Sequence, residues 1–145
     1  MTLETVGRSP VDVVTADLSF ISATRAVPVL VGEVVAPGSP VIILVKPQFE
    51  AGRIEASRGR GVIRDPDIHR RTLGEVTGAL AAAGADVLGV MPSPITGSAG
   101  NIEFLVHART PWADPAGPAH PRSGATLAEQ VEEAVAEAHV ENGPG

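Results

Sequence analysis

Three charged side chains in the sequence could act together on a proton. Asp17 ends a β-branched segment, Lys46 directly follows a wholly apolar run, and Glu103 lies near the start of the last predicted strand. In open α/β sheets, reactive groups gather at the carboxyl ends of the strands. Because we expect the last strand to run antiparallel to the others, its beginning lies at the same edge. The sequence therefore predicts that these three side chains converge on one rim of a sheet.

Lys46 is the only lysine in the chain, beside ten arginines. An amine can lose its proton when it is removed from water, whereas a guanidinium effectively cannot. This difference makes Lys46 a candidate general base. The residues alone leave plainer interpretations open. Lys46 could extend its charged end into water, Asp17 could cap the following helix, and Glu103 could be an exposed strand residue.

The elements that position these residues are predicted from hydrophobic periodicity and from cap and turn residues. Pro28 lies inside the first helical pattern, so that helix either starts late or bends there. Asp65 and Gly84 bound the second helix, and Thr126 with Glu129 forms a capping box for the third. The predicted strands are 11–16, 41–45, 85–90 and 102–108, and the predicted helices are 27–35, 65–84 and 126–139.

The order of these elements predicts the fold class. Strands and helices alternate in the first part of the chain, and two strands then follow one another directly. The run 41–45 is apolar throughout, which is typical of a strand buried on both faces. We therefore expect an α/β protein whose sheet is parallel in its first part and closes with an antiparallel strand.

The composition excludes several classes of protein. The chain has no Cys, so it has no disulfides, no thiolate chemistry and no Cys-bound zinc. Its four His residues show no metal-ligand spacing, and we expect no metal site. The longest apolar runs are about five residues, far below the ~20 needed to cross a bilayer, and no secretion leader is visible. We expect a soluble, cytoplasmic protein.

Positive charge is concentrated in one segment of an otherwise acidic chain. The formal net charge is −6, yet the segment 51–71 holds six arginines and only three acidic residues. Such a segment is either a solvated loop or a contact for a phosphate-rich partner. The candidate residues for contact with phosphates are Arg53, Arg58, Arg60 and Arg64.

Four motifs resemble those of a known family. They occur in order between about residues 9 and 109, and the resemblance is to the hemolysin A (TlyA) family of ribosomal RNA 2′-O-methyltransferases, which have an FtsJ-like methyltransferase domain. The stretch Lys46-Pro-Gln-Phe-Glu is the most specific. The motifs are Asp17-Leu-Ser-Phe-Ile-Ser, Leu44-Val-Lys-Pro-Gln-Phe-Glu-Ala-Gly-Arg, Gly61-Val-Ile-Arg-Asp-Pro and Ser93-Pro-Ile-Thr-Gly-Ser-Ala-Gly-Asn-Ile-Glu-Phe.

The resemblance implies a reaction and a set of partners. The family uses a Lys-Asp-Lys-Glu tetrad, and Asp17, Lys46 and Glu103 match three of its members. It implies transfer of a methyl group from S-adenosylmethionine to a ribose 2′-hydroxyl of ribosomal RNA or of a ribosomal subunit. Lys46 would take the hydroxyl proton or hold the alkoxide, oriented by the two carboxylates. The resemblance also implies that cofactor contacts come from Asp17, Leu18, Ser19 and Phe20.

Other family features have no counterpart in the sequence. No lysine precedes Asp17, and neither a Gly-rich cofactor turn nor an S4-type RNA-binding domain is recognisable. We therefore predict the C-terminal half of a Rossmann-like S-adenosylmethionine-dependent methyltransferase sheet, whose first strand leaves an unpaired edge. The predicted organisation is a partial FtsJ-like domain over 1–110, a Pro/Gly-rich linker over 111–124 and an acidic helix and tail over 125–145.

Two other functions compete with methyl transfer. The chain could be a non-catalytic remnant that binds RNA or a protein partner through the segment 53–71, with an affinity that falls steeply with salt. A pore-forming hemolysin is the weaker alternative. The sequence offers no membrane span, and the polar face of the helix at 126–139 is acidic, the wrong sign for anionic lipid.

Overall fold

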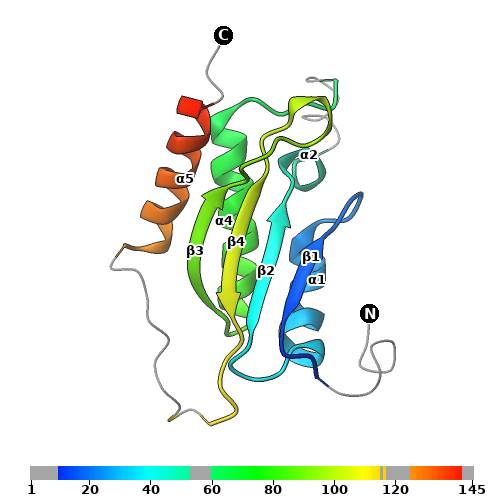
Figure 1. The fold of residues 1–145 in the computed structure, drawn as a ribbon, viewed down its shortest axis with the longest axis vertical. Helices are drawn as coiled ribbons and strands as arrows, with labels where there is room; N and C mark the ends of the chain where they lie inside the picture. Colours follow the sequence, from blue (N-terminus) through cyan, green and yellow to red (C-terminus); the bar gives the residue numbers. More distant parts are fainter. Residues whose placement is uncertain (1–9, 53–59, 115, 117–124, 142–145) are drawn as a thin grey trace.

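Four strands form one mixed sheet in the computed structural model, which describes residues 10–52, 60–114, 116 and 125–141. The strand order is β1-β2-β4-β3, with β1 parallel to β2 and β4 antiparallel to both of its neighbours (Figure 1). This arrangement confirms the predicted α/β sheet with a closing antiparallel strand. The strands are β1 (Val14–Asp17), β2 (Pro40–Val45), β3 (Asp86–Pro92) and β4 (Phe104–Arg109).

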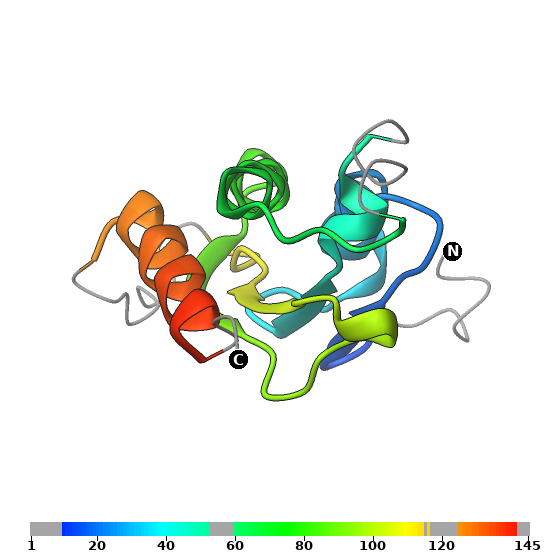
Figure 2. The ribbon, with the colours of Figure 1, turned by 90° about the horizontal axis from the view of Figure 1, so that it is seen from above.

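The two long helices and the first short one pack against this sheet. In Figure 1, α1 and α4 lie behind the strands and α5 runs alongside β3. The short helix α2 and the turn η2 lie at the end of the sheet seen from above in Figure 2. The helices are α1 (Ala23–Val29), η1 (Leu30–Val34), α2 (Pro47–Glu50), α4 (Pro66–Ala82), η2 (Ser98–Gly100) and α5 (Leu127–Glu141).

The core lies between the sheet and the helices behind it. Alternate residues of β2 and β4 are buried and the residues between them are half-buried. The core therefore covers one face of each strand, whereas the apolar run 41–45 predicted burial on both faces. The apolar face of α4 that the periodicity predicts is fully buried against them. The central residues of this core are Val41, Ile43, Val45, Leu73, Val76, Leu80, Phe104 and Val106.

The predicted helix caps are confirmed. The Asp65 side chain accepts a hydrogen bond from the amide of Asp67 at 2.9 Å. Gly84 follows α4 with φ +84°, a conformation that glycine adopts without steric cost. Thr126 and Glu129 exchange the two hydrogen bonds of a capping box, at 2.6 and 3.2 Å. Short-range cap chemistry was therefore sufficient to predict these ends.

The first helix begins earlier than its apolar pattern predicts. The expected span was 27–35, but α1 starts at Ala23, because Ser22 caps it by accepting from the amide of Thr24. Pro28 lies inside the helix and is followed by the π-helical turn η1. Proline has no N–H for the intrahelical bond, so the regular helix is interrupted near this residue rather than started by it.

Two strands are shorter at their beginnings than predicted. The first was expected over 11–16, but β1 begins at Val14, and Val11 forms only an isolated bridge with Val35. The last was expected to include Glu103, but β4 begins at Phe104. Glu103 therefore precedes the strand. Among the residues that the structure describes, β1 pairs with β2 alone and lies at one edge of the sheet.

The C-terminal helix packs back onto the domain. Val131, Val135 and Ala138 of α5 are buried in the same core cluster as the sheet, and α5 contacts both β3 and α4. Most of the predicted linker at 111–124 lies outside the described residues. Across the residues that the structure describes, α-helices are all too short or too polar to span a bilayer.

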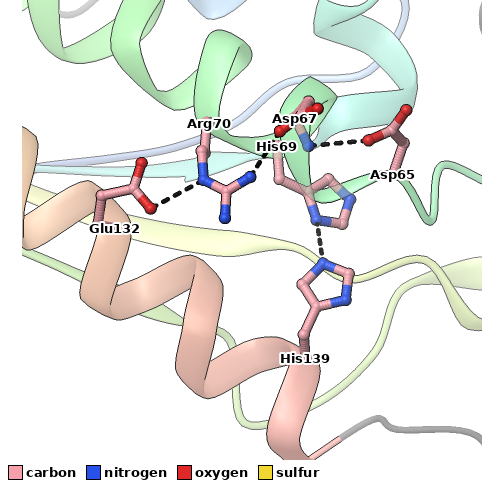
Figure 3. Close-up of polar contacts among 6 residues, drawn as sticks. All are labelled: Asp65, Asp67, His69, Arg70, Glu132 and His139. Carbon is pink, nitrogen blue, oxygen red and sulfur yellow. Dashed lines mark hydrogen bonds and ion pairs between the residues drawn. The ribbon is translucent and has the colours of Figure 1, made fainter.

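A pair of histidines joins α4 to α5 (Figure 3). The ring of His69 is fully buried, with Nε2 3.2 Å from the carbonyl oxygen of Ile63 and Nδ1 3.1 Å from Nε2 of His139. A carbonyl only accepts, so Nε2 of His69 donates to it and the neutral Nδ1 accepts from His139. Burial lowers the pKa of His69 to about 4, with a smaller lowering from His139 and opposing contributions from the Ile63 carbonyl and Asp65.

This buried ring predicts acid sensitivity. The pKa of His69 is about 4 when folded and near 6.5 when unfolded, so the unfolded chain binds more protons between these values. Stability is therefore lost as pH falls from 6.5 towards 4, by about 2–3 kcal/mol at pH 4.5 from this residue. Urea unfolding at pH 7 and pH 4.5 measures the loss, and His69→Gln, which keeps a side-chain donor, should lose less. Equal losses in the two proteins would show that His69 is not the cause.

Candidate functional site

Lys46 and Asp17 meet at the carboxyl ends of two parallel strands. Asp17 is the last residue of β1, and Lys46 follows β2 directly. The Lys46 Nζ forms an ion pair with the Asp17 Oδ1. The lysine side chain is only 14% exposed, whereas that of the aspartate is 63% exposed. The structure therefore brings together two of the three predicted catalytic residues, with the amine shielded and the carboxylate facing solvent.

Glu103 lies at the same rim but makes a different contact. Val45 of β2 pairs with Phe104 of β4 in the antiparallel register. Lys46, which follows Val45, is therefore opposite Glu103, which precedes Phe104. Glu103 is 7% exposed, and its Oε1 accepts a hydrogen bond from Nε2 of Gln48 at 3.1 Å. The carboxylate is thus held by Gln48, a residue whose role the sequence did not indicate.

The short helix α2 connects three parts of this rim. Lys46 is its N-cap residue and Pro47 is its first residue, where a fixed φ and a missing N–H are tolerated. Gln48 reaches Glu103, and Glu50 reaches the start of α1. Four residues are too few to show a helical period, so α2 was not predicted. Proline directly after a strand-end residue was the available signal.

The loop between β1 and α1 holds an exposed aromatic ring in a strained backbone conformation. Phe20 has φ +66°, which costs a residue with a side chain about 1–2 kcal/mol. Phe20 is 91% exposed, and the centroid of its ring lies 5.0 Å from that of the Phe49 ring. Among the other predicted cofactor residues, Ser19 is exposed and Leu18 packs partly against the core. Strain that surrounding contacts maintain is typical of functional loops.

The arginine segment does not act as a single patch. Arg70 pairs with Asp67 and Glu132 at 2.7 and 2.8 Å, and Arg71 pairs with Glu75 at 3.7 Å. The Arg70 side chain thus joins α4 to α5, and the Arg71 side chain forms an ion pair along the surface of α4. The remaining candidates divide by position: Arg60 and Arg64 are exposed, and Arg53 and Arg58 lie outside the described residues.

The loop between β3 and β4 is fixed from both sides. Asn101 is 2% exposed; its Oδ1 accepts from the amide of Ile63, and its Nδ2 donates to the carbonyl of Gly61, at 3.0 and 2.9 Å. Asn101 therefore has a structural role: it joins the segment before α4, through Gly61 and Ile63, to the segment before β4. Gly97 of the same loop lies against Glu103, since a Cβ there would be 2.1 Å from Oε1.

These features define an open α/β protein whose polar groups gather at the carboxyl ends of its parallel strands. The sequence model of the FtsJ-like methyltransferase family matches residues 1–110. The chain belongs to the FtsJ-like methyltransferase family.

Known relatives agree with this assignment. The chain is 42% identical over 125 residues to "Putative rRNA methyltransferase YqxC" of Bacillus subtilis, covering 86% of this chain and 42% of that protein. It is 39% identical over 110 residues to "16S/23S rRNA (cytidine-2'-O)-methyltransferase TlyA" of Mycobacterium tuberculosis, covering 76% and 40%. It also matches "Hemolysin A" of Brachyspira hyodysenteriae, at 38% identity over 95 residues. The chain thus spans about two fifths of the length of these relatives.

A solved structure shows the same fold. The chain superposes on "Putative hemolysin from Streptococcus thermophilus" with a TM-score of 0.80 and 34% identity. The superposition covers 97% of this chain and 47% of that one. The predicted resemblance to the TlyA family and the predicted fold class are both confirmed.

The contact between Gly97 and Glu103 gives a test of the site geometry. In Gly97→Ala the new methyl group displaces the Glu103 carboxylate, so Gln48 is left without its acceptor. We expect the side-chain amide signals of Gln48 to move in a ¹H–¹⁵N spectrum, where they can be assigned because the chain has only two glutamines. We also expect the free energy of unfolding to fall by about 1–2 kcal/mol.

Gly74→Ala is the matched control for this substitution. It adds a methyl group on α4 with nothing within 4 Å, and it should leave the Gln48 amide unchanged. Because alanine favours a helix, this variant should be slightly more stable than the parent. Unmoved Gln48 signals in Gly97→Ala would contradict the described packing of Glu103.

Proposed function

We propose that this chain forms a methyl-transfer site of an S-adenosylmethionine-dependent enzyme that acts on a ribose 2′-hydroxyl of ribosomal RNA. The observation that supports it is the shielded Lys46 amine paired with Asp17 at the strand ends, with buried Glu103 at the same rim. Family membership supports methyl transfer, the names of two relatives support ribosomal RNA as substrate, and one of these names also supports the 2′-oxygen. With a ribosomal substrate, the proposed reaction would take place in the cytoplasm.

The chain's own residues supply proton transfer and orientation. A ribose hydroxyl must lose its proton as its oxygen forms the new bond to carbon. In our proposal the neutral form of the Lys46 amine accepts this proton at Nζ, and the resulting ammonium group is held in place by its ion pair with Asp17. Glu103, held by Gln48, adds negative charge beside the protonated amine and so stabilises it. Arginine at position 46 would keep the pairing but could not accept the proton.

The loop after β1 has groups that suit a nucleoside cosubstrate. The Asp17 carboxylate is mostly exposed and can accept hydrogen bonds from hydroxyl groups, and the exposed Phe20 ring can contact a base. Ser19 adds an exposed hydroxyl. When bound, S-adenosylmethionine supplies a methyl group on a positively charged sulfur. Residues 17–20 would hold this molecule next to Lys46.

The RNA backbone would be held by the exposed part of the arginine segment. Arg60 and Arg64 face solvent on the approach to α4. Asn101 ties this approach to the residues just before Glu103, so these arginines have a fixed place relative to the rim. The same exposure supports the alternative function, a protein that binds RNA without transferring a methyl group. Titration with S-adenosylmethionine and with ribosomal RNA separates the two, since RNA binding alone favours the alternative.

Lys46→Arg tests the proposed chemistry. In the protein expressed from its complete reading frame, we expect transfer of tritiated methyl groups to ribosomal RNA to fall at least about 100-fold, because the proton acceptor is removed while the charge remains. The product of the parent protein should resist alkaline cleavage at the modified nucleotide, since a 2′-O-methyl group cannot attack the adjacent phosphate.

The surface substitution Arg71→Lys is the control for Lys46→Arg, because it exchanges the same two residue types on α4. It should leave the transfer rate unchanged. A Lys46→Arg protein that keeps most of its activity would show that Lys46 does not accept the proton. Methylated RNA that is cleaved by alkali at the modified nucleotide would show that the ribose is not the target.

Arg60 and Arg64 give a separate prediction about RNA binding. Replacing both by Gln should weaken binding to a labelled ribosomal RNA fragment and lower the slope of log affinity against log salt by about 0.7–0.9 for each phosphate that the protein no longer neutralises. Fluorescence anisotropy at several salt concentrations measures both effects. Arg70→Gln is the control, because Arg70 already pairs with Asp67 and Glu132. Equal slopes in all three proteins would argue against phosphate binding by Arg60 and Arg64.

A further inference from the structure

Glu50, the last residue of α2, makes two hydrogen bonds to a segment far away in sequence. Its Oε2 accepts from the hydroxyl of Ser22 at 2.6 Å, and its Oε1 accepts from the amide of Ala23 at 2.8 Å. Both donors lie at the start of α1. Hydrogen bonds to an ionised carboxylate are stronger than those between neutral groups. Glu50 therefore fixes the point where the loop after β1 enters α1.

The two ends of α2 hold the two ends of the same loop. At its start, Lys46 pairs with Asp17, the last residue of β1. At its end, Glu50 holds Ser22 and Ala23, where the loop finishes. The geometry of the loop over 17–22 is thus set at both ends by one short helix.

The loop needs external support because its own conformation is unfavourable. Phe20 is held at φ +66°, and because the residue is 91% exposed it gains little from burial. Its ring contacts Phe49, the neighbour of Glu50 on α2. At the end where the loop enters α1, the contacts shown here come from the end of α2: the ring of Phe49 and the two hydrogen bonds of Glu50.

We propose that Glu50 is a positioning residue of the site: by holding Ser22 and Ala23 it keeps Asp17 against the amine of Lys46. This inference rests on the proposed function of that pair in methyl transfer. A simpler role is a cap for α1, since a carboxylate is favourable at a helix N-terminus. That role would affect α1 alone. A positioning role also affects Lys46, which lies at the opposite end of α2.

The single lysine makes the test direct. In the 145-residue chain labelled with ¹³C,¹⁵N-lysine, every lysine side-chain signal comes from Lys46. Asp17→Asn gives the signal positions for a broken pair. We expect Glu50→Gln to move the Lys46 signals at least half as far in the same direction, because the new amide keeps one acceptor and places a donor against the second donor. Glu33→Gln, on the exposed side of η1, makes the same chemical change and should not move them.

Lys46 signals that stay at the parent position in Glu50→Gln, while the α1 amides change, would overturn the proposal and leave Glu50 a helix cap. If Glu50→Gln does not give a folded spectrum, Ser22→Ala removes one of the two bonds and is judged by the same criterion. The measurement needs neither S-adenosylmethionine nor RNA. A failure of positioning is therefore distinguishable from a failure of the proposed methyl transfer, which only the transfer assay reports.

Discussion

The arrangement of the residues at the rim of the sheet depends on one constraint: the largely buried ammonium group of Lys46 needs a partner of opposite charge. Moving a charged side chain out of water is costly unless an opposite charge and further polar contacts compensate. Lys46 is shielded because it follows β2, which has neighbours on both sides, and its compensation comes from Asp17 at the edge strand. The pairing in turn sets where the loop after β1 must run. Lys46 is the only lysine in a chain that contains ten arginines.

Strand register brings the groups to one place before any side chain makes contact. Asp17 is opposite Leu44 in the parallel pair, two residues before Lys46. Phe104 is opposite Val45 in the antiparallel pair, so Glu103 comes level with Lys46. A shift of one residue in either pairing would turn one carboxylate to the other face of the sheet. The buried alternate residues of β2 and β4 prevent such a shift, so the hydrophobic core also determines the geometry of the site.

Local chemistry and periodicity were enough to predict the class of fold, three of the helix boundaries and the meeting of Asp17 with Lys46. Capping bonds span two or three residues, so they are visible in the sequence, as at Asp65 and Thr126. The contacts of Gln48 and Glu50 join residues 55 and 27 positions apart, and no local pattern indicates them. The buried His69 also depends on α5, which is 70 residues away at the contact. Tertiary contacts of this kind require the folded arrangement.

Each residue of the stretch Lys46-Pro-Gln-Phe-Glu has a separate role at the rim of the sheet. In our proposal Lys46 transfers the proton, whereas the carboxylate of Glu50 is held by Ser22 and Ala23. Pro47 begins the helix, Gln48 holds Glu103, Phe49 contacts Phe20, and Glu50 holds the start of α1. Each of the last three touches a different part of the rim, so replacing one should disturb a contact that the others cannot restore. Placement of the chemical group therefore uses more residues of this stretch than the chemistry itself.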